Sequence, residues 1–97
     1  MNPKSVEIII SGRVQGVGFR PFVYNLAKKH NIKGFVTNVE KGVLIRALAD
    51  ETVLESFYDQ ILIQKPRSSD ITSSQKRTIL STENFDDFVI KPTAPSL

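Results

Sequence analysis

The chain of 97 residues contains no cysteine, no tryptophan and a single histidine. Without cysteine, neither a disulfide framework nor a thiolate metal site can form, and His30 cannot build a metal site by itself. No stretch approaches the roughly 18 consecutive apolar residues that a membrane-spanning helix needs. The sequence therefore predicts a domain with no cofactor, no metal and no membrane partner.

The length and charge set further limits. A chain of 97 residues has room for one core, since single domains run from about 50 to 200 residues. The N-terminus MNPKSVEIII leads straight into a strand-like pattern without a small-residue cleavage site, so we expect no signal peptide and a cytoplasmic location. The net charge of +3 leaves two partner classes open, a small anion and a nucleic acid.

The first third of the chain predicts a strand followed by a helix. Val6 to Ile10 is β-branched and alternates weakly, which favours a buried strand. Pro21 suits the first turn of a helix because its missing N–H is not needed there, and apolar side chains then recur at helical spacing as far as His30. We therefore expect the helix to begin at Pro21, with Arg20 as the last residue before it.

The middle of the chain predicts a β-hairpin and a second helix. Gly34 to Val39 and Val43 to Ala49 are two strand patterns, and the turn between them offers Gly42 for a left-handed position. Asp50 suits the N-cap of a helix that ends before Pro66. An apolar stripe supports this helix, made of Val53, Leu54, Phe57, Ile61 and Leu62.

The last third predicts a closing strand and a tail. Ile71 to Leu80 has a weak strand pattern, and Phe85 to Ile90 has the pattern of a closing strand. We expect residues 1–91 to form the domain and residues 92–97 a tail or the start of a linker, because two prolines and little that can pack occur there. The element order predicts an α+β, ferredoxin-like βαββαβ fold, one antiparallel sheet with two helices on one face.

The junction between the first strand and the first helix reads GRVQGVGFRPF, with three glycines and two arginines from Gly12 to Phe22. Glycines before a helix N-terminus let several backbone N–H groups converge on one anion. A guanidinium at Arg20 could bind two oxygens of a phosphoryl group. The residues placed to form such a nest of convergent backbone N–H groups are Gln15, Gly16, Val17, Gly18 and Phe19. The spacing matches neither GxGxxG nor the Walker motif, so an anion site and a tight structural turn both remain open.

Two motifs resemble those of a known family. GRVQGVGFR is similar to the acylphosphatase signature G-x-V-Q-G-V-x-F-R at every fixed position, and GFVTNVEKGV is similar to the second motif of that family. The resemblance implies metal-free hydrolysis of an acyl phosphate to a carboxylate and inorganic phosphate. It also implies that Arg20 and the amides of Gln15 to Phe19 bind the phosphoryl group and that Asn38 holds the attacking water, which makes Arg20 and Asn38 the catalytic residues.

A narrower resemblance involves GVGFRPFVYNLA. It is similar to the N-terminal acylphosphatase-like domain of the HypF carbamoyltransferases, which mature the cyanide ligands of nickel–iron hydrogenases. This resemblance implies carbamoyl phosphate as the substrate and further domains on the C-terminal side. Thr37, before Asn38, departs from the Arg or Gln that many acylphosphatases carry. Such a departure bears on substrate preference rather than on the phosphate site.

Three alternatives accompany this interpretation. A free-standing acylphosphatase and a non-catalytic phosphate-binding interaction domain both agree with the motifs. An RNA-recognition module shares the element order, and Lys33 to Val36 begins like its RNP1 box. That box belongs on the third strand, however, and Val43 to Ala49 contains no aromatic residue. We therefore expect no nucleic-acid partner.

Overall fold

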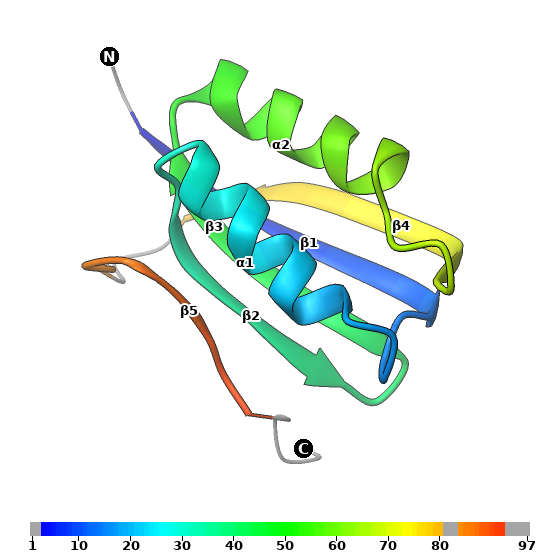
Figure 1. The fold of residues 1–97 in the computed structure, drawn as a ribbon. Helices are drawn as coiled ribbons and strands as arrows, with labels where there is room; N and C mark the ends of the chain where they lie inside the picture. Colours follow the sequence, from blue (N-terminus) through cyan, green and yellow to red (C-terminus); the bar gives the residue numbers. More distant parts are fainter. Residues whose placement is uncertain (1–2, 81–83, 93–97) are drawn as a thin grey trace.

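The computed structural model describes residues 3–80 and 84–92. Five strands form one sheet in the order β4-β1-β3-β2-β5, and both helices lie on the same face of it (Figure 1). The elements are β1 (Lys4–Arg13), α1 (Phe19–Lys29), β2 (Lys33–Val39), β3 (Gly42–Ala49), α2 (Glu51–Ile63), β4 (Asp70–Ile79) and β5 (Phe88–Ile90). The ferredoxin-like fold expected from the sequence is confirmed.

The region after α2 contains two strands, where the two patterns after the second helix were expected, although the βαββαβ order counts only one there. β4 pairs antiparallel with β1, whereas the short β5 pairs in parallel with β2 at the opposite edge of the sheet. Phe88 anchors β5 because its ring is buried and contacts the rings of Tyr24 and Phe57 at centroid distances of 6.5 Å. The sheet is therefore antiparallel except at this edge.

Alternate side chains of the central strands form the core beneath the helices. The buried residues are Val6, Ile8 and Ile10 on β1, with Val43, Ile45 and Ala47 on β3. The helices cover them with Phe19, Val23, Leu26 and Ala27 from α1 and with Leu54, Phe57 and Ile61 from α2. Each large side chain buried in this way contributes about 1.5–3 kcal/mol to folding, which fixes both helices against the sheet.

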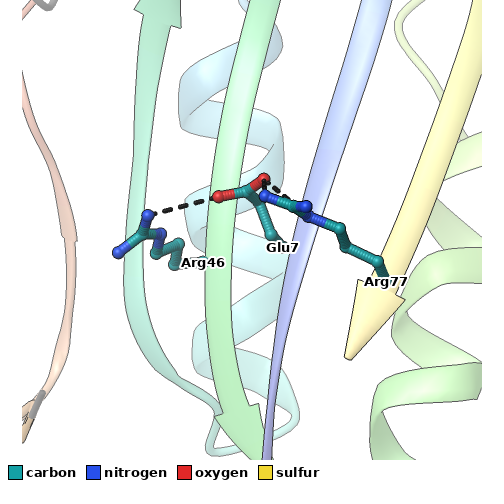
Figure 2. A network of polar contacts seen from close by, with 3 residues as sticks. All are labelled: Glu7, Arg46 and Arg77. Atoms are coloured by element: carbon teal, nitrogen blue, oxygen red, sulfur yellow. Dashed lines mark hydrogen bonds and ion pairs between the residues drawn. The ribbon is translucent and has the colours of Figure 1, made fainter. Parts of the chain in front are cut away.

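The other face of the sheet is not covered by α1 or α2, and a buried carboxylate lies on it (Figure 2). Glu7 on β1 stands opposite Arg46 on β3 and Arg77 on β4. Its Oε2 accepts a hydrogen bond from Arg46 Nη2 at 3.2 Å, and its Oε1 accepts two from Arg77, at 3.1 Å from Nε and 2.9 Å from Nη2. These bonds link three neighbouring strands and satisfy a carboxylate that is only 8% exposed.

Helix α1 begins at Phe19, two residues before the expected start at Pro21. Gly18 is the N-cap, with a left-handed φ of 79°, and Pro21 is the third helical residue. Proline is tolerated there because the N–H groups of the first turn have no partner inside the helix. The expectation that Arg20 precedes the helix is therefore wrong. Arg20 is the second residue of its first turn.

The hairpin turn is also tighter than expected. Glu40 and Lys41 alone connect β2 to β3. Gly42 is the first residue of β3, and its φ is not positive. The expectation that Gly42 is left-handed is therefore wrong. Gly42 is required for a different reason, because a Cβ there would collide with the backbone carbonyl of Ile10 on β1.

The expected bounds of α2 are confirmed, whereas β1 (Lys4–Arg13) is longer than expected and β5 begins at Phe88 rather than Phe85. Asp50 occupies the N-cap of α2, although its side chain makes no capping hydrogen bond, and the helix ends at Ile63, before Pro66. Neither helix in the described part of the chain is long and apolar enough to cross a membrane. Of the predicted tail at 92–97, only Pro92 is described, and the rest lies outside the described residues.

Candidate active site

A cavity of about 220 Å³ opens where the glycine-rich loop leads into α1. It is lined by Val14, Gly16, Gly18, Phe19, Arg20, Pro21 and Asn38. The fold thus brings Arg20 from α1 and Asn38 from β2 to the same cavity. A larger cavity, of about 430 Å³, is lined by other residues, among them His30, Lys33 and Asp50, and by none of the candidate catalytic or phosphate-binding residues.

Two left-handed glycines shape the loop. Gly16 and Gly18 have φ values of 73° and 79°, a region that other residues enter only at a cost. A Cβ on either glycine would meet no atom within 4 Å, so the requirement for glycine is conformational rather than steric. Among residues 3–80 and 84–92, no backbone carbonyl accepts a hydrogen bond from the N–H of Gln15, Gly16, Val17 or Gly18. These donors are available to an anion.

The first turn of α1 adds positive potential to the cavity. The N–H groups of Phe19 and Arg20 have no partner inside the helix, and the first turn contains no acidic residue. Arg20 is partly buried, and its Nη1 donates a hydrogen bond to Lys91 O at 3.1 Å. A guanidinium has five N–H donors, so this one bond leaves the others for a ligand.

Asn38 provides a different kind of group. The residue is 8% exposed, and its Oδ1 is buried and accepts no hydrogen bond from any part of the chain that the structure describes. An unpaired buried acceptor costs about 1–3 kcal/mol, and this one belongs to a residue that lines the cavity. A water molecule in the cavity would donate a hydrogen bond to it.

Gln15 and Val17 do not line the cavity. The side chain of Gln15 turns to the hairpin, where its Nε2 donates to Val39 O at 2.6 Å and to Gly42 O at 2.8 Å. Val17 is partly buried and packs against the hydrophobic core. The loop sequence indicated a role only for the backbone amide of Gln15 and not this side-chain contact, because no local pattern shows which loop residue reaches a hairpin beyond the following helix.

The far end of α1 is held by an ion pair. Lys28 Nζ lies 2.6 Å from Asp87 Oδ1, in the segment before β5. The hydrogen bond from Lys28 lowers the pKa of Asp87, and the same bond raises the pKa of Lys28. The pair connects α1 to the β5 edge of the sheet.

Comparisons with known proteins agree with the fold and the motifs. A family model described as acylphosphatase matches residues 6–90. The acylphosphatase of Pseudothermotoga lettingae is 45% identical over 90 residues, which cover 92% of this chain and 99% of that protein. The probable carbamoyltransferase HypF of Methanocaldococcus jannaschii is 42% identical over 85 residues, or 88% of this chain. The match spans only 11% of that HypF protein.

A solved structure shows the same relationship in three dimensions. The crystal structure of full-length HypF in the phosphate- and nucleotide-bound form superposes with a TM-score of 0.89 and 39% sequence identity. The superposition covers 95% of this chain and 12% of the HypF chain.

Proposed function

The chain belongs to the acylphosphatase family, and from that premise we propose that it hydrolyses acyl phosphates in the cavity shared by Arg20 and Asn38 without needing a metal ion. The proposal assigns the phosphoryl group to the unpaired N–H donors of the loop and of the first turn of α1. Arg20 supplies a full positive charge beside them. Phosphoryl transfer depends mainly on positioning and on charge stabilisation, which these groups provide.

The chemical step follows from the positions of the donors and the acceptor. A water molecule held by Asn38 Oδ1 attacks the phosphorus atom, and the bond from phosphorus to the bridging oxygen breaks. The electron pair of that bond leaves with the acyl group as a carboxylate, which is stable at neutral pH and needs no general acid. A proton of the attacking water passes to a phosphoryl oxygen of the substrate, so inorganic phosphate is the second product.

One observation favours hydrolysis over non-catalytic phosphate binding. The cavity combines a cluster of unpaired donors with one unpaired buried acceptor, Asn38 Oδ1. Donors suit the oxygens of a phosphoryl group, whereas an amide oxygen repels them and accepts a hydrogen bond only from a donor such as water. A site that merely bound a dianionic phosphoryl group, which has no O–H, would have no use for that acceptor.

We further propose carbamoyl phosphate as the physiological substrate, in a HypF-type hydrogenase maturation protein of which this chain is the N-terminal domain. The similarity to HypF supports it, and a cavity of about 220 Å³ suits a small acyl group. Identity to a free-standing acylphosphatase is nearly the same, 45% against 42%. Sequence identity therefore does not distinguish a HypF domain from a free-standing acylphosphatase, and the preferred substrate has to do so.

The experiment measures phosphate release from benzoyl phosphate and from carbamoyl phosphate with a chelator present. The proposal predicts hydrolysis of both, with kcat/KM for carbamoyl phosphate at least as high as for benzoyl phosphate. Hydrolysis of benzoyl phosphate alone would favour a free-standing acylphosphatase. A chain that binds phosphate but hydrolyses neither compound would be a non-catalytic phosphate-binding domain.

A further inference from the structure

The backbone that follows β5 holds the arginine of the cavity in place. Lys91 N donates to Val36 O at 2.9 Å, which extends the pairing with β2 beyond the end of β5. Lys91 O accepts the hydrogen bond from Arg20 Nη1 at 3.1 Å. The orientation of the Arg20 guanidinium thus depends on where residues 91 and 92 lie.

Thr37 fixes that segment from the opposite face of β2. Successive side chains of a strand point to opposite faces, so Thr37 points away from the face that Asn38 shares with the cavity. Its hydroxyl donates to Pro92 O at 2.5 Å, and the residue is 3% exposed. The same hydroxyl lies 3.4 Å from Asn38 O, at the limit of hydrogen bonding. A hydroxyl has one proton to donate, and the shorter contact takes it.

The Thr37 hydroxyl continues the attachment of this segment to β2. Lys91 N donates to Val36 O, and one residue later the threonine hydroxyl donates to the Pro92 carbonyl. Lys91 adds a second anchor, because its Nζ lies 4.0 Å from the centroid of the Phe35 ring. The Lys91 carbonyl, which accepts the hydrogen bond from Arg20, therefore lies between two anchored groups, the Lys91 side chain and the Pro92 carbonyl.

We propose that Thr37 is a positioning residue for acyl-phosphate hydrolysis, because its hydroxyl fixes residues 91 and 92 and thereby orients Arg20. The inference rests on the proposed function, which assigns the phosphoryl group to Arg20. An arginine side chain has many rotamers, and the bond to Lys91 O selects one of them before the ligand arrives. Loss of the Thr37 hydroxyl releases Pro92 O and loosens that selection.

A matched control exists elsewhere in the chain. Ser69 is 5% exposed, and its Oγ donates to Pro66 O at 2.6 Å. This is also a buried hydroxyl bonded to a prolyl carbonyl, but Pro66 is remote in sequence from Lys91, whose carbonyl accepts the bond from Arg20. Removal of the Ser69 hydroxyl therefore measures what such a bond contributes to folding alone.

The experiment compares Thr37→Val, Thr37→Ser and Ser69→Ala with the wild type. It measures the dissociation constant of inorganic phosphate, the kcat and KM for benzoyl phosphate, and the Tm. We expect Thr37→Val to raise the phosphate dissociation constant and the KM about fivefold, the effect of one net hydrogen bond. Thr37→Ser should stay within about twofold of the wild type, and Ser69→Ala should lower the Tm without changing phosphate affinity.

Several results would overturn the positioning role. They are an unchanged phosphate affinity in Thr37→Val, an equal loss in Ser69→Ala, or a Thr37→Ser variant as weak as Thr37→Val. A wild type that binds no phosphate would overturn it too. A wild type that binds phosphate, shows the Thr37→Val effect and hydrolyses no acyl phosphate would sustain the role of Thr37 and contradict the proposed function instead.

Discussion

Gln15 Nε2 lies 2.6 Å from Val39 O, at the end of β2. The same nitrogen also donates to Gly42 O at 2.8 Å, at the start of β3. The two bonds fix the glycine-rich loop to the hairpin next to Asn38. The donors of the loop and the acceptor of β2 therefore belong to one rigid frame.

Gln15→Leu removes both donors with little change in volume. We expect the phosphate dissociation constant to rise about 10- to 30-fold, since two net hydrogen bonds contribute about 2 kcal/mol to holding the loop. Phosphate titration measures this. Gln60→Leu is the control, because Gln60 on α2 donates to Ser56 Oγ far from the cavity lining. Equal phosphate affinity in the two variants would contradict the role of Gln15.

Gly16→Ala and Gly18→Ala test the left-handed loop. An added Cβ has open space at both positions, so the cost is the backbone strain of about 1–2 kcal/mol. We expect phosphate affinity to fall at least about tenfold while stability in urea falls by no more than that strain. Gly42→Ala should instead destabilise the fold more strongly, because its Cβ would meet the Ile10 carbonyl. Wild-type phosphate affinity in Gly16→Ala would contradict an amide nest.

Glu7→Gln tests the ion pairs on the uncovered face (Figure 2). The change removes the charge that Arg46 and Arg77 share, and a loss of about 1–3 kcal/mol in unfolding free energy is expected for bonds to a charged group. Arg77→Gln should cost less than about 1 kcal/mol, because the Arg77 side chain is 72% exposed. Urea denaturation measures both. Equal losses in the two variants would show that the burial of Glu7 does not determine how much its ion pairs contribute to the free energy of unfolding.

The Lys28–Asp87 pair predicts a dependence of stability on pH. The pKa of Asp87 is lowered from 3.8 and that of Lys28 is raised from 10.5 by their hydrogen bond. The stabilisation is therefore fully present between these two values. It is lost as the pH falls through the lowered pKa of Asp87, and also as the pH rises through the raised pKa of Lys28.

The test compares the Tm of the wild type with that of Lys28→Gln. The difference should be small, because both side chains are exposed. It should be constant between about pH 5 and pH 9 and should disappear in strong acid, where Asp87 is protonated. A difference that grows in acid would contradict the assigned signs.

The sequence predicted the order of the elements, and its resemblance to the acylphosphatase motifs implied that Arg20 and Asn38 share one site. β-branched strands, apolar stripes and two motifs carry that information locally. It could not predict the start of α1, because Pro21 fits any position in a first turn and the N-cap is a left-handed Gly18 without a side chain. The sequence also could not predict the side-chain contacts of Gln15 and Thr37, because their partners follow much later in the chain.

The most direct test of the account is the kinetics of Arg20→Ala and Asn38→Ala with benzoyl phosphate, together with the phosphate affinity of each. Arg20→Ala should weaken phosphate binding and lower kcat/KM about 100- to 1,000-fold, as expected for loss of a main charge-stabilising donor. Asn38→Ala should lower kcat by a similar factor of about 100 or more, yet leave phosphate affinity within a few-fold, because it holds the water and not the phosphoryl group. A wild-type kcat/KM in either variant would contradict the account.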